Sequence, residues 1–151
     1  MKKYCLLFIA SCFSCFIVLS QEAFTINDFK KLKWLEGKWE GTAAGEQPFY
    51  EQYQFLNDST LAMLYFKDAS FTGKPDTGWV YLKEKNIVHR SGNALWKLTS
   101  LKEKEIVFEP INVKRGFVWR KENNDQWDAV LDMQNKEGQV AAKTYTLKRK
   151  G

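Results

Sequence analysis

Cysteine and histidine are scarce in this sequence of 151 residues, which has three cysteines and one histidine. Cys5, Cys12 and Cys15 all lie near the N-terminus, and His89 stands alone. Beyond Cys15 the chain therefore cannot form a disulfide or a zinc site built from cysteine and histidine. It also lacks the G-x-S-x-G, phosphate-loop and G-x-G-x-x-G motifs of serine hydrolases and nucleotide-binding proteins. We expect no catalytic residues of these classes, no cofactor and no metal.

A long apolar run occurs only once, over residues 4–19, directly after two lysines. Val18 and Ser20 place β-branched and small residues at the −3 and −1 positions of a signal-peptidase site. About sixteen apolar residues fall short of the ~20 that a membrane-spanning helix needs. We therefore expect residues 1–20 to be a signal peptide. Residues 21–151 would form one exported domain, periplasmic or secreted, with no membrane span after cleavage.

Two alternatives stay open for this N-terminal segment. Ile9-Ala10-Ser11-Cys12 resembles a bacterial lipobox, which would attach a lipid to Cys12. An uncleaved segment would instead anchor the same domain to a membrane. In each case the domain itself has no thiol, so its stability has to come from packing, which about 131 residues can provide.

Positive charge exceeds negative charge only slightly. Without Lys2 and Lys3, 21 of the 23 basic residues remain against 18 acidic ones, a net charge of +3. The basic clusters at 30–33, 102–104 and 148–150 are interspersed with or flanked by acidic or apolar residues, as on solvated faces. We therefore expect no nucleic-acid partner.

Helical periodicity is limited to one segment after the signal. Thr25 or Asn27 can cap a helix there, Asp28 suits its first turn, and Gly37 ends the pattern. One helix of about ten residues is expected from the near-helical spacing of Ile26, Phe29, Leu32 and Leu35.

The rest of the domain alternates short β-branched or aromatic segments with turn residues. About ten strands are expected, at 38–43, 49–56, 60–66, 78–83, 87–90, 94–99, 106–111, 117–121, 126–133 and 140–148. Most connections have hairpin length, so sequential strands are antiparallel neighbours, because a parallel crossover needs a dozen or more residues. A meander without helices to cover its faces is stable only if it closes. The expected fold class is all-β, an antiparallel up-and-down barrel with one short N-terminal helix.

The start of the first strand carries a motif. A short helix runs into Gly37-Lys38-Trp39, which resembles the G-x-W signature of lipocalins and other members of the calycin superfamily. The resemblance implies a calycin-like barrel in which Trp39 plugs one end and a basic residue of the last strand packs over its indole. Arg149 is the matching position, with Lys148 as the alternative, and the disulfide common in lipocalins has no counterpart. The chain is also similar to secreted bacterial lipocalin-like domains of unknown function, through residues 34–41, Glu51 and 108–109.

The side chains that face the lumen decide what such a barrel can do. Successive strand residues point to opposite faces, so Glu51 shares a face with Phe49, Tyr53 and Phe55. If that aromatic face is the inner one, the carboxylate needs a partner, because an unpaired buried charge is costly. The alternative places Glu51 in solvent at the barrel mouth. The candidate lumen residues are Glu51, Tyr53, Met63, Tyr65, Trp96, Glu109, Trp119 and Arg120.

These candidates favour a barrel that binds a small apolar or amphipathic molecule in a mostly apolar pocket with a few polar groups. Two alternatives stay open. The 19 aromatic residues after position 20 could fill a small barrel completely, which would make it a scaffold or interaction module. An enzyme would instead use Glu51 and Glu109 as acid and base, with Arg120.

Two further positions have possible roles. His89 could ligate haem, as in some ten-stranded barrels, although a lone histidine in a strand is more often a surface or hydrogen-bonded residue. Phe71 lies at the centre of the longest connection, residues 68–78, and could cover the open end of the barrel as a lid.

Overall fold

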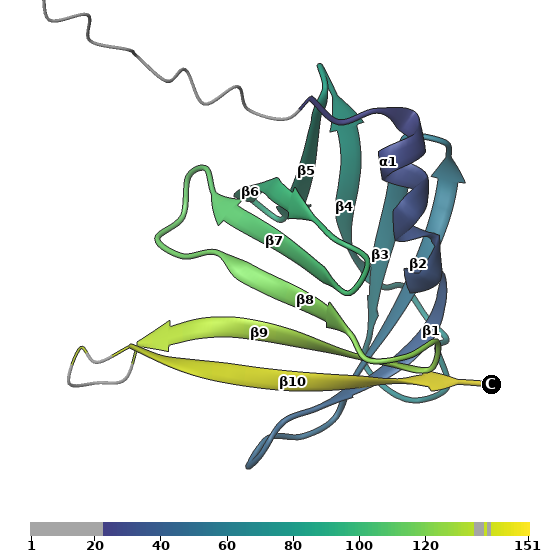
Figure 1. The fold of residues 1–151 in the computed structure, drawn as a ribbon. Coiled ribbons are helices and arrows are strands. Elements are labelled where there is room, and N and C mark those ends of the chain that lie inside the picture. Colours follow the sequence, from purple (N-terminus) through teal and green to yellow (C-terminus); the bar gives the residue numbers. More distant parts are fainter. Residues whose placement is uncertain (1–22, 135–137, 139) are drawn as a thin grey trace, which may run out of the picture.

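A computed structural model describes residues 23–134, 138 and 140–151 of the chain. Within these residues, ten strands form a barrel, and one short helix precedes them (Figure 1). The expected signal peptide, its cleavage site after Ser20 and the alternative lipid anchor at Cys12 lie outside the described residues and stay predictions. Within the described ranges, no helix combines the length and the apolar character that crossing a bilayer requires.

A capping box starts the helix. Helix α1 (Ile26–Lys30) is capped by Thr25, whose hydroxyl accepts a hydrogen bond from the Asp28 amide, while the Asp28 carboxylate accepts one from the Thr25 amide. The chain then tightens into the 3₁₀ helix η1 (Lys31–Leu35). It leaves the helix at Gly37, where φ is 127°. The expected helix of about ten residues is therefore confirmed, with Thr25 as its cap.

The strands follow as one continuous meander. Sequential strands pair antiparallel, and the first pairs with the last, which closes the barrel. This closure confirms the expected fold class, and each predicted strand agrees with an observed one to within two residues at either end. The strands are β1 (Gly37–Thr42), β2 (Phe49–Asn57), β3 (Thr60–Phe66), β4 (Asp76–Lys83), β5 (Asn86–Ser91), β6 (Ala94–Leu101), β7 (Glu105–Pro110), β8 (Phe117–Lys121), β9 (Gln126–Gln134) and β10 (Val140–Lys150).

Alternation along each strand gives the barrel its inner face. On β5, the buried side chains of Ile87 and His89 alternate with half-buried Val88 and exposed Arg90. The same period-two pattern places buried residues on the inside of β4 and β7. The hydrophobic core is therefore the lumen itself.

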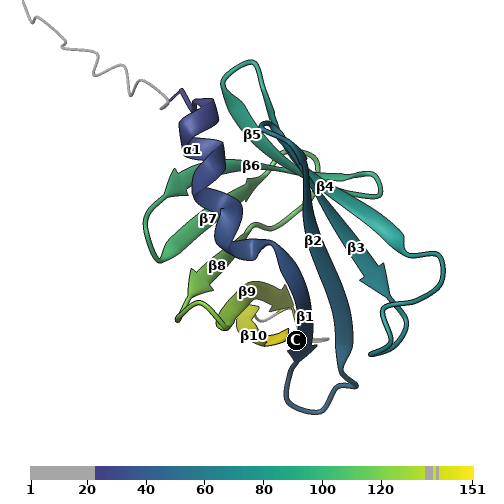
Figure 2. The same cartoon turned by 90° about the vertical axis from the view of Figure 1, so that its right-hand side faces the viewer.

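The helix closes one end of the barrel. Phe29 on α1 is fully buried, and its ring packs edge-on against Phe55 at the end of β2, with 5.7 Å between ring centroids. Trp34 on η1 packs in the same way against Trp127 at the start of β9, at 6.0 Å. Figure 2 shows the helix lying across the strands. At the opposite end, where β2, β8 and β10 begin, the described part of the chain has no helix.

Trp39 plugs the lumen beneath the helix. Its side chain is fully buried, and its indole N–H donates a hydrogen bond of 2.7 Å to the Leu35 carbonyl oxygen. Arg149, the residue paired with it on β10, lies over the indole with the guanidinium carbon 4.2 Å from the ring centroid. Gly37 leaves room for this side chain, because a Cβ there would lie 2.5 Å from Nη1 of Arg149. Arg149, and not the exposed Lys148, thus occupies the position expected of the basic residue.

Candidate functional site

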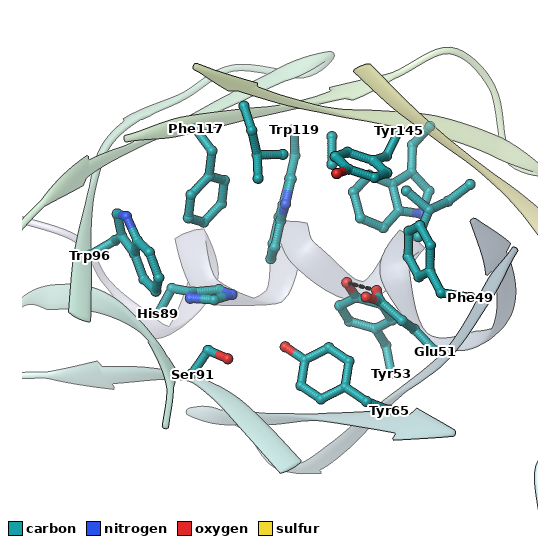
Figure 3. Close-up of a pocket in the computed structure, with 14 residues that line it drawn as sticks. Phe49, Glu51, Tyr53, Tyr65, His89, Ser91, Trp96, Phe117, Trp119 and Tyr145 are labelled. Carbon is teal, nitrogen blue, oxygen red and sulfur yellow. Dashed lines mark hydrogen bonds between the residues drawn. The ribbon is translucent and has the colours of Figure 1, made fainter. Parts of the chain in front are cut away.

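A cavity of about 300 Å³ lies in the lumen, towards the open end of the barrel. Figure 3 shows its side chains converging on one space, with the helix behind them at the closed end. Most of the side chains that line it are aromatic. The lining residues are Phe49, Glu51, Tyr53, Tyr65, His89, Ser91, Trp96, Phe117, Trp119, Trp127, Ala129, Leu131, Tyr145 and Leu147.

Interlocking rings form the floor of the cavity. Trp127 makes edge-on contacts with Trp39, Tyr53 and Trp119, at centroid distances of 6.1, 5.9 and 5.5 Å. All four side chains are buried. Rings therefore fill the lumen next to the helix, and the cavity of about 300 Å³ lies beyond them.

Glu51 reaches into the cavity from β2, paired with Trp39 on β1 and with Tyr65 on β3. The phenol of Tyr53, two residues further along the same face, donates a hydrogen bond of 2.7 Å to Glu51 Oε2 (Figure 3). Among the described residues, Tyr53 is the only hydrogen-bond donor to this carboxyl group. Burial raises the pKa of Glu51 from 4.5 to about 7, because this one hydrogen bond offsets only part of the lost hydration. The carboxyl group is therefore poised to gain or lose a proton near neutral pH.

The hydroxyl groups around Glu51 stay protonated. Burial, and next the nearby Glu51 carboxyl, raise the pKa of Tyr53 well above the usual value for a phenol. The same two causes raise the pKa of Tyr65. With Ser91, these phenols give the cavity neutral hydroxyl groups that can donate and accept hydrogen bonds.

His89 sits within an aromatic wall of the cavity. Its ring lies 5.0–5.7 Å, between centroids, from the rings of Trp96, Phe108, Phe117 and Trp119. Burial lowers the pKa of His89 to about 3, so its imidazole is neutral. Its Nδ1 is buried and has no hydrogen-bond partner in the described part of the chain. It is thus neither a surface histidine nor one held by a hydrogen bond at Nδ1.

The structure brings most of the candidate lumen residues together. Met63 is buried on the same face of β3 as Tyr65 but does not line the cavity. Those that do line it are Glu51, Tyr53, Tyr65, Trp96 and Trp119. Their role in binding stays a prediction.

Glu109 and Arg120 do not face the lumen, so that expectation is wrong for both. Each directly follows a buried residue that points inward, Phe108 on β7 and Trp119 on β8, and alternation therefore turns it outward. Glu109 is exposed, and Arg120 forms a 3.3 Å ion pair with Glu105 on the outer surface. Glu51 therefore lies inside the barrel, whereas Glu109 and Arg120 lie outside it. The three residues of the hypothetical enzyme do not form one site.

Several cavity residues were not among the candidates. They follow the same alternation as the predicted ones, so counting every second residue along β9 and β10 from Trp127 and Leu147 would have found most of them. The lining residues outside the eight candidates are Phe49, His89, Ser91, Phe117, Trp127, Ala129, Leu131, Tyr145 and Leu147.

Phe71 does not cover the open end, so the expected lid is wrong. Its ring packs against Tyr50 at 5.9 Å and Phe66 at 5.5 Å, and the Lys38 ammonium group lies 5.1 Å from its centroid. These three partners each neighbour an inward-facing residue in sequence and therefore point outward. The connection folds back along the outer wall, with Phe71 in the left-handed region at φ 52°.

No protein-family model matches the chain, and no curated protein matches it. Among solved structures, the chain is similar to Rv2717c from M. tuberculosis, with 15% identity, a TM-score of 0.50, and coverage of 82% of this chain and 98% of that one. A redesigned β-barrel, b11L5F_LGL, matches with 19% identity and a TM-score of 0.37, over 80% and 96% of the two chains. EF1p2_mFAP2b bound to DFHBI matches with 15% identity and a TM-score of 0.35, over 81% and 98%. The likeness to Rv2717c supports the barrel fold of this chain.

Proposed function

We propose that this chain is an exported, lipocalin-like barrel that binds a small apolar or amphipathic molecule in its lumen. The observation that carries the proposal is the aromatic cavity of about 300 Å³. Its volume lies at the lower end of the roughly 300–1,000 Å³ typical of small-molecule pockets. Such a space would hold on the order of ten waters against mostly apolar walls, so a ligand that displaces them buries apolar surface on both sides.

A few polar groups among the rings support a binding role. Glu51, Tyr65 and Ser91 present a carboxyl and two hydroxyl groups to the cavity, which could orient a ligand. Small-molecule sites commonly combine an apolar lining with a small number of placed polar groups.

The sequence supports the family and the location. The Gly37-Lys38-Trp39 motif, with Arg149 over the indole of Trp39, fits a lipocalin-like barrel. The apolar segment over 1–20 fits a signal peptide, and a domain free of cysteine suits an oxidising compartment.

The filled floor of the barrel favours a second candidate, a scaffold with no ligand. Four buried rings already close the half of the lumen next to the helix. In such a protein the remaining cavity would hold only water, and the outer surface would carry the function.

Native mass spectrometry of the protein purified from the cells or medium of its own organism tests the proposal. We expect the mass of residues 21–151 plus that of a small bound molecule. Tryptophan fluorescence would then be quenched when a panel of fatty acids, aromatic amines, aromatic alcohols and haem is added, because four tryptophans surround the cavity or its floor. The bare mass alone, with no quenching by any member of the panel, would favour the scaffold. A mass that includes residues 1–20 would contradict cleavage.

A further inference from the structure

The charged side chain that lines the cavity is acidic. Glu51 is the one acidic residue that lines the cavity, and among the described residues no lysine or arginine lines it. Two basic side chains of β10 have partners outside the cavity. Arg149 lies beneath the floor over Trp39. Lys143 forms an ion pair with Glu46, and its ammonium group lies 5.2 Å from the ring centroid of Tyr145. Within residues 23–134, 138 and 140–151, the carboxylate of Glu51 thus has no positively charged partner.

We propose that the lumen selects an organic amine, whose ammonium group pairs with Glu51 while its apolar body lies among the rings. This inference rests on the proposed function and names the ligand class for the same cavity.

The surroundings of Glu51 suit an ammonium group. Tyr53 occupies Oε2, and no described residue donates a hydrogen bond to Oε1. The hydroxyl groups of Tyr65 and Ser91 face the same space and can accept hydrogen bonds (Figure 3). An ammonium group has up to three N–H donors, which matches one carboxylate oxygen and two hydroxyls.

An anionic ligand would be repelled by Glu51. A carboxylate placed in this cavity would add a second negative charge beside Glu51, and no basic residue of the described part of the chain lines the cavity to compensate it. One of the two groups would have to stay protonated. A neutral ligand avoids the repulsion but leaves the Glu51 carboxyl without a charged partner. The amine is therefore favoured over an alcohol, and the alcohol over a carboxylate.

The protonation of Glu51 gives this preference a pH dependence. Among the described residues, the other titratable groups that line the cavity are Tyr53, Tyr65, Tyr145 and His89, from β2, β3, β10 and β5. Burial lowers the pKa of His89 to about 3 and raises those of Tyr53 and Tyr65, so these three keep their protonation between pH 6 and pH 8. Glu51 ionises within that interval, while an alkylammonium group, like that of lysine, stays charged up to about pH 10. Amine binding should therefore tighten as the pH rises.

Calorimetric titration with three matched ligands tests the inference. The ligands are 2-phenylethylamine, 2-phenylethanol and 3-phenylpropanoate, which share a phenyl ring and a short chain but differ in charge. At pH 8 we expect the amine to bind roughly tenfold or more tighter than the alcohol, as charge-assisted pairing implies, and the carboxylate to bind weakest. The amine Kd should also fall about tenfold from pH 6 to pH 8.

Two variants separate Glu51 from other acidic residues. Glu51→Gln should bring the amine affinity to within about threefold of the alcohol affinity, because only the charge is removed. Glu109→Gln, which removes an exposed acid on the outer wall, should leave the amine affinity unchanged. If Glu51→Gln fails to fold, the pH dependence of the unmodified protein still tests the role of the carboxylate.

The outcomes distinguish the two proposals. Equal or tighter binding of the alcohol or the carboxylate, or an amine Kd that does not change with pH, would overturn the amine inference and leave lumen binding standing. Failure of all three ligands, together with no quenching by the wider panel, would overturn both.

Discussion

Arg149 lies over the indole of Trp39 and from there connects segments that are far apart in the sequence. Its guanidinium group donates hydrogen bonds of 2.8–3.1 Å to the carbonyl oxygens of Trp34, Glu36 and Asn124. The helix end, the turn between β8 and β9, and the closing pair of β1 and β10 therefore meet at one side chain.

Replacing Arg149 with lysine should lower the free energy of unfolding by about 2 kcal/mol, because a single ammonium group cannot reach all three carbonyl oxygens that the planar guanidinium fork reaches. Urea unfolding followed by tryptophan fluorescence measures the change. Lys148→Ala, at the exposed neighbour, is the matched control and should cost less than about 0.5 kcal/mol. Equal losses in the two variants would contradict the role assigned to Arg149.

Glu51 should make the protein less stable as the pH rises from 4.5 to 7. In this interval the folded protein keeps a proton on Glu51 that the unfolded chain has lost, so the free energy of unfolding decreases with rising pH. Glu51→Gln removes this contribution. Relative to the unmodified protein, the variant should gain roughly 3 kcal/mol between pH 4.5 and pH 7.5, measured by urea unfolding at each pH.

Glu109→Gln serves as the control for this titration, because Glu109 is exposed on the outer wall. Its stability should follow that of the unmodified protein at every pH. If Glu109→Gln gained as much free energy of unfolding as Glu51→Gln, the buried carboxyl group of Glu51 would not be the source of the pH dependence.

His89 should make the protein less stable as the pH falls. The folded protein keeps the imidazole neutral down to about pH 3, whereas the unfolded chain takes up a proton near pH 6.5, so the free energy of unfolding falls as the pH drops below 6.5. His89→Phe should therefore gain roughly 3 kcal/mol relative to the unmodified protein between pH 6.5 and pH 4. Since His89 is the single histidine, its imidazole NMR signal gives an independent reading. A titration midpoint near pH 6.5 in the folded protein would contradict its burial.

The fold could be predicted because its signals are local. Hairpin-length connections require antiparallel neighbours, and Thr25 with Asp28 marks the helix start within four residues. The largest differences are at strand ends. β10 runs to Lys150, two residues beyond its predicted end, because Lys150 still pairs with Lys38 on β1.

The site could be predicted only in part, because charge and alternation point to different residues. Glu51 is both charged and on the inward-facing side of its strand, since it shares that face with Tyr53. The charge of Glu109 and Arg120 suggests a site, but their position next to inward-facing residues turns them outward. The aromatic count could not show how much of the lumen is open, because rings such as Phe71 pack on the outer wall.

Filling the cavity from one wall tests lumen binding most directly. Ala129 on β9 lines the cavity, paired with Tyr145 and with Trp119, so the ring introduced by Ala129→Phe would occupy the ligand space. Ala142→Phe, at an exposed position of β10, adds the same ring outside. In calorimetric titrations with 1-naphthol, the unmodified protein and Ala142→Phe should bind with the same Kd, and Ala129→Phe should bind about tenfold more weakly or not at all. Equal binding by all three proteins would contradict a ligand site in the lumen.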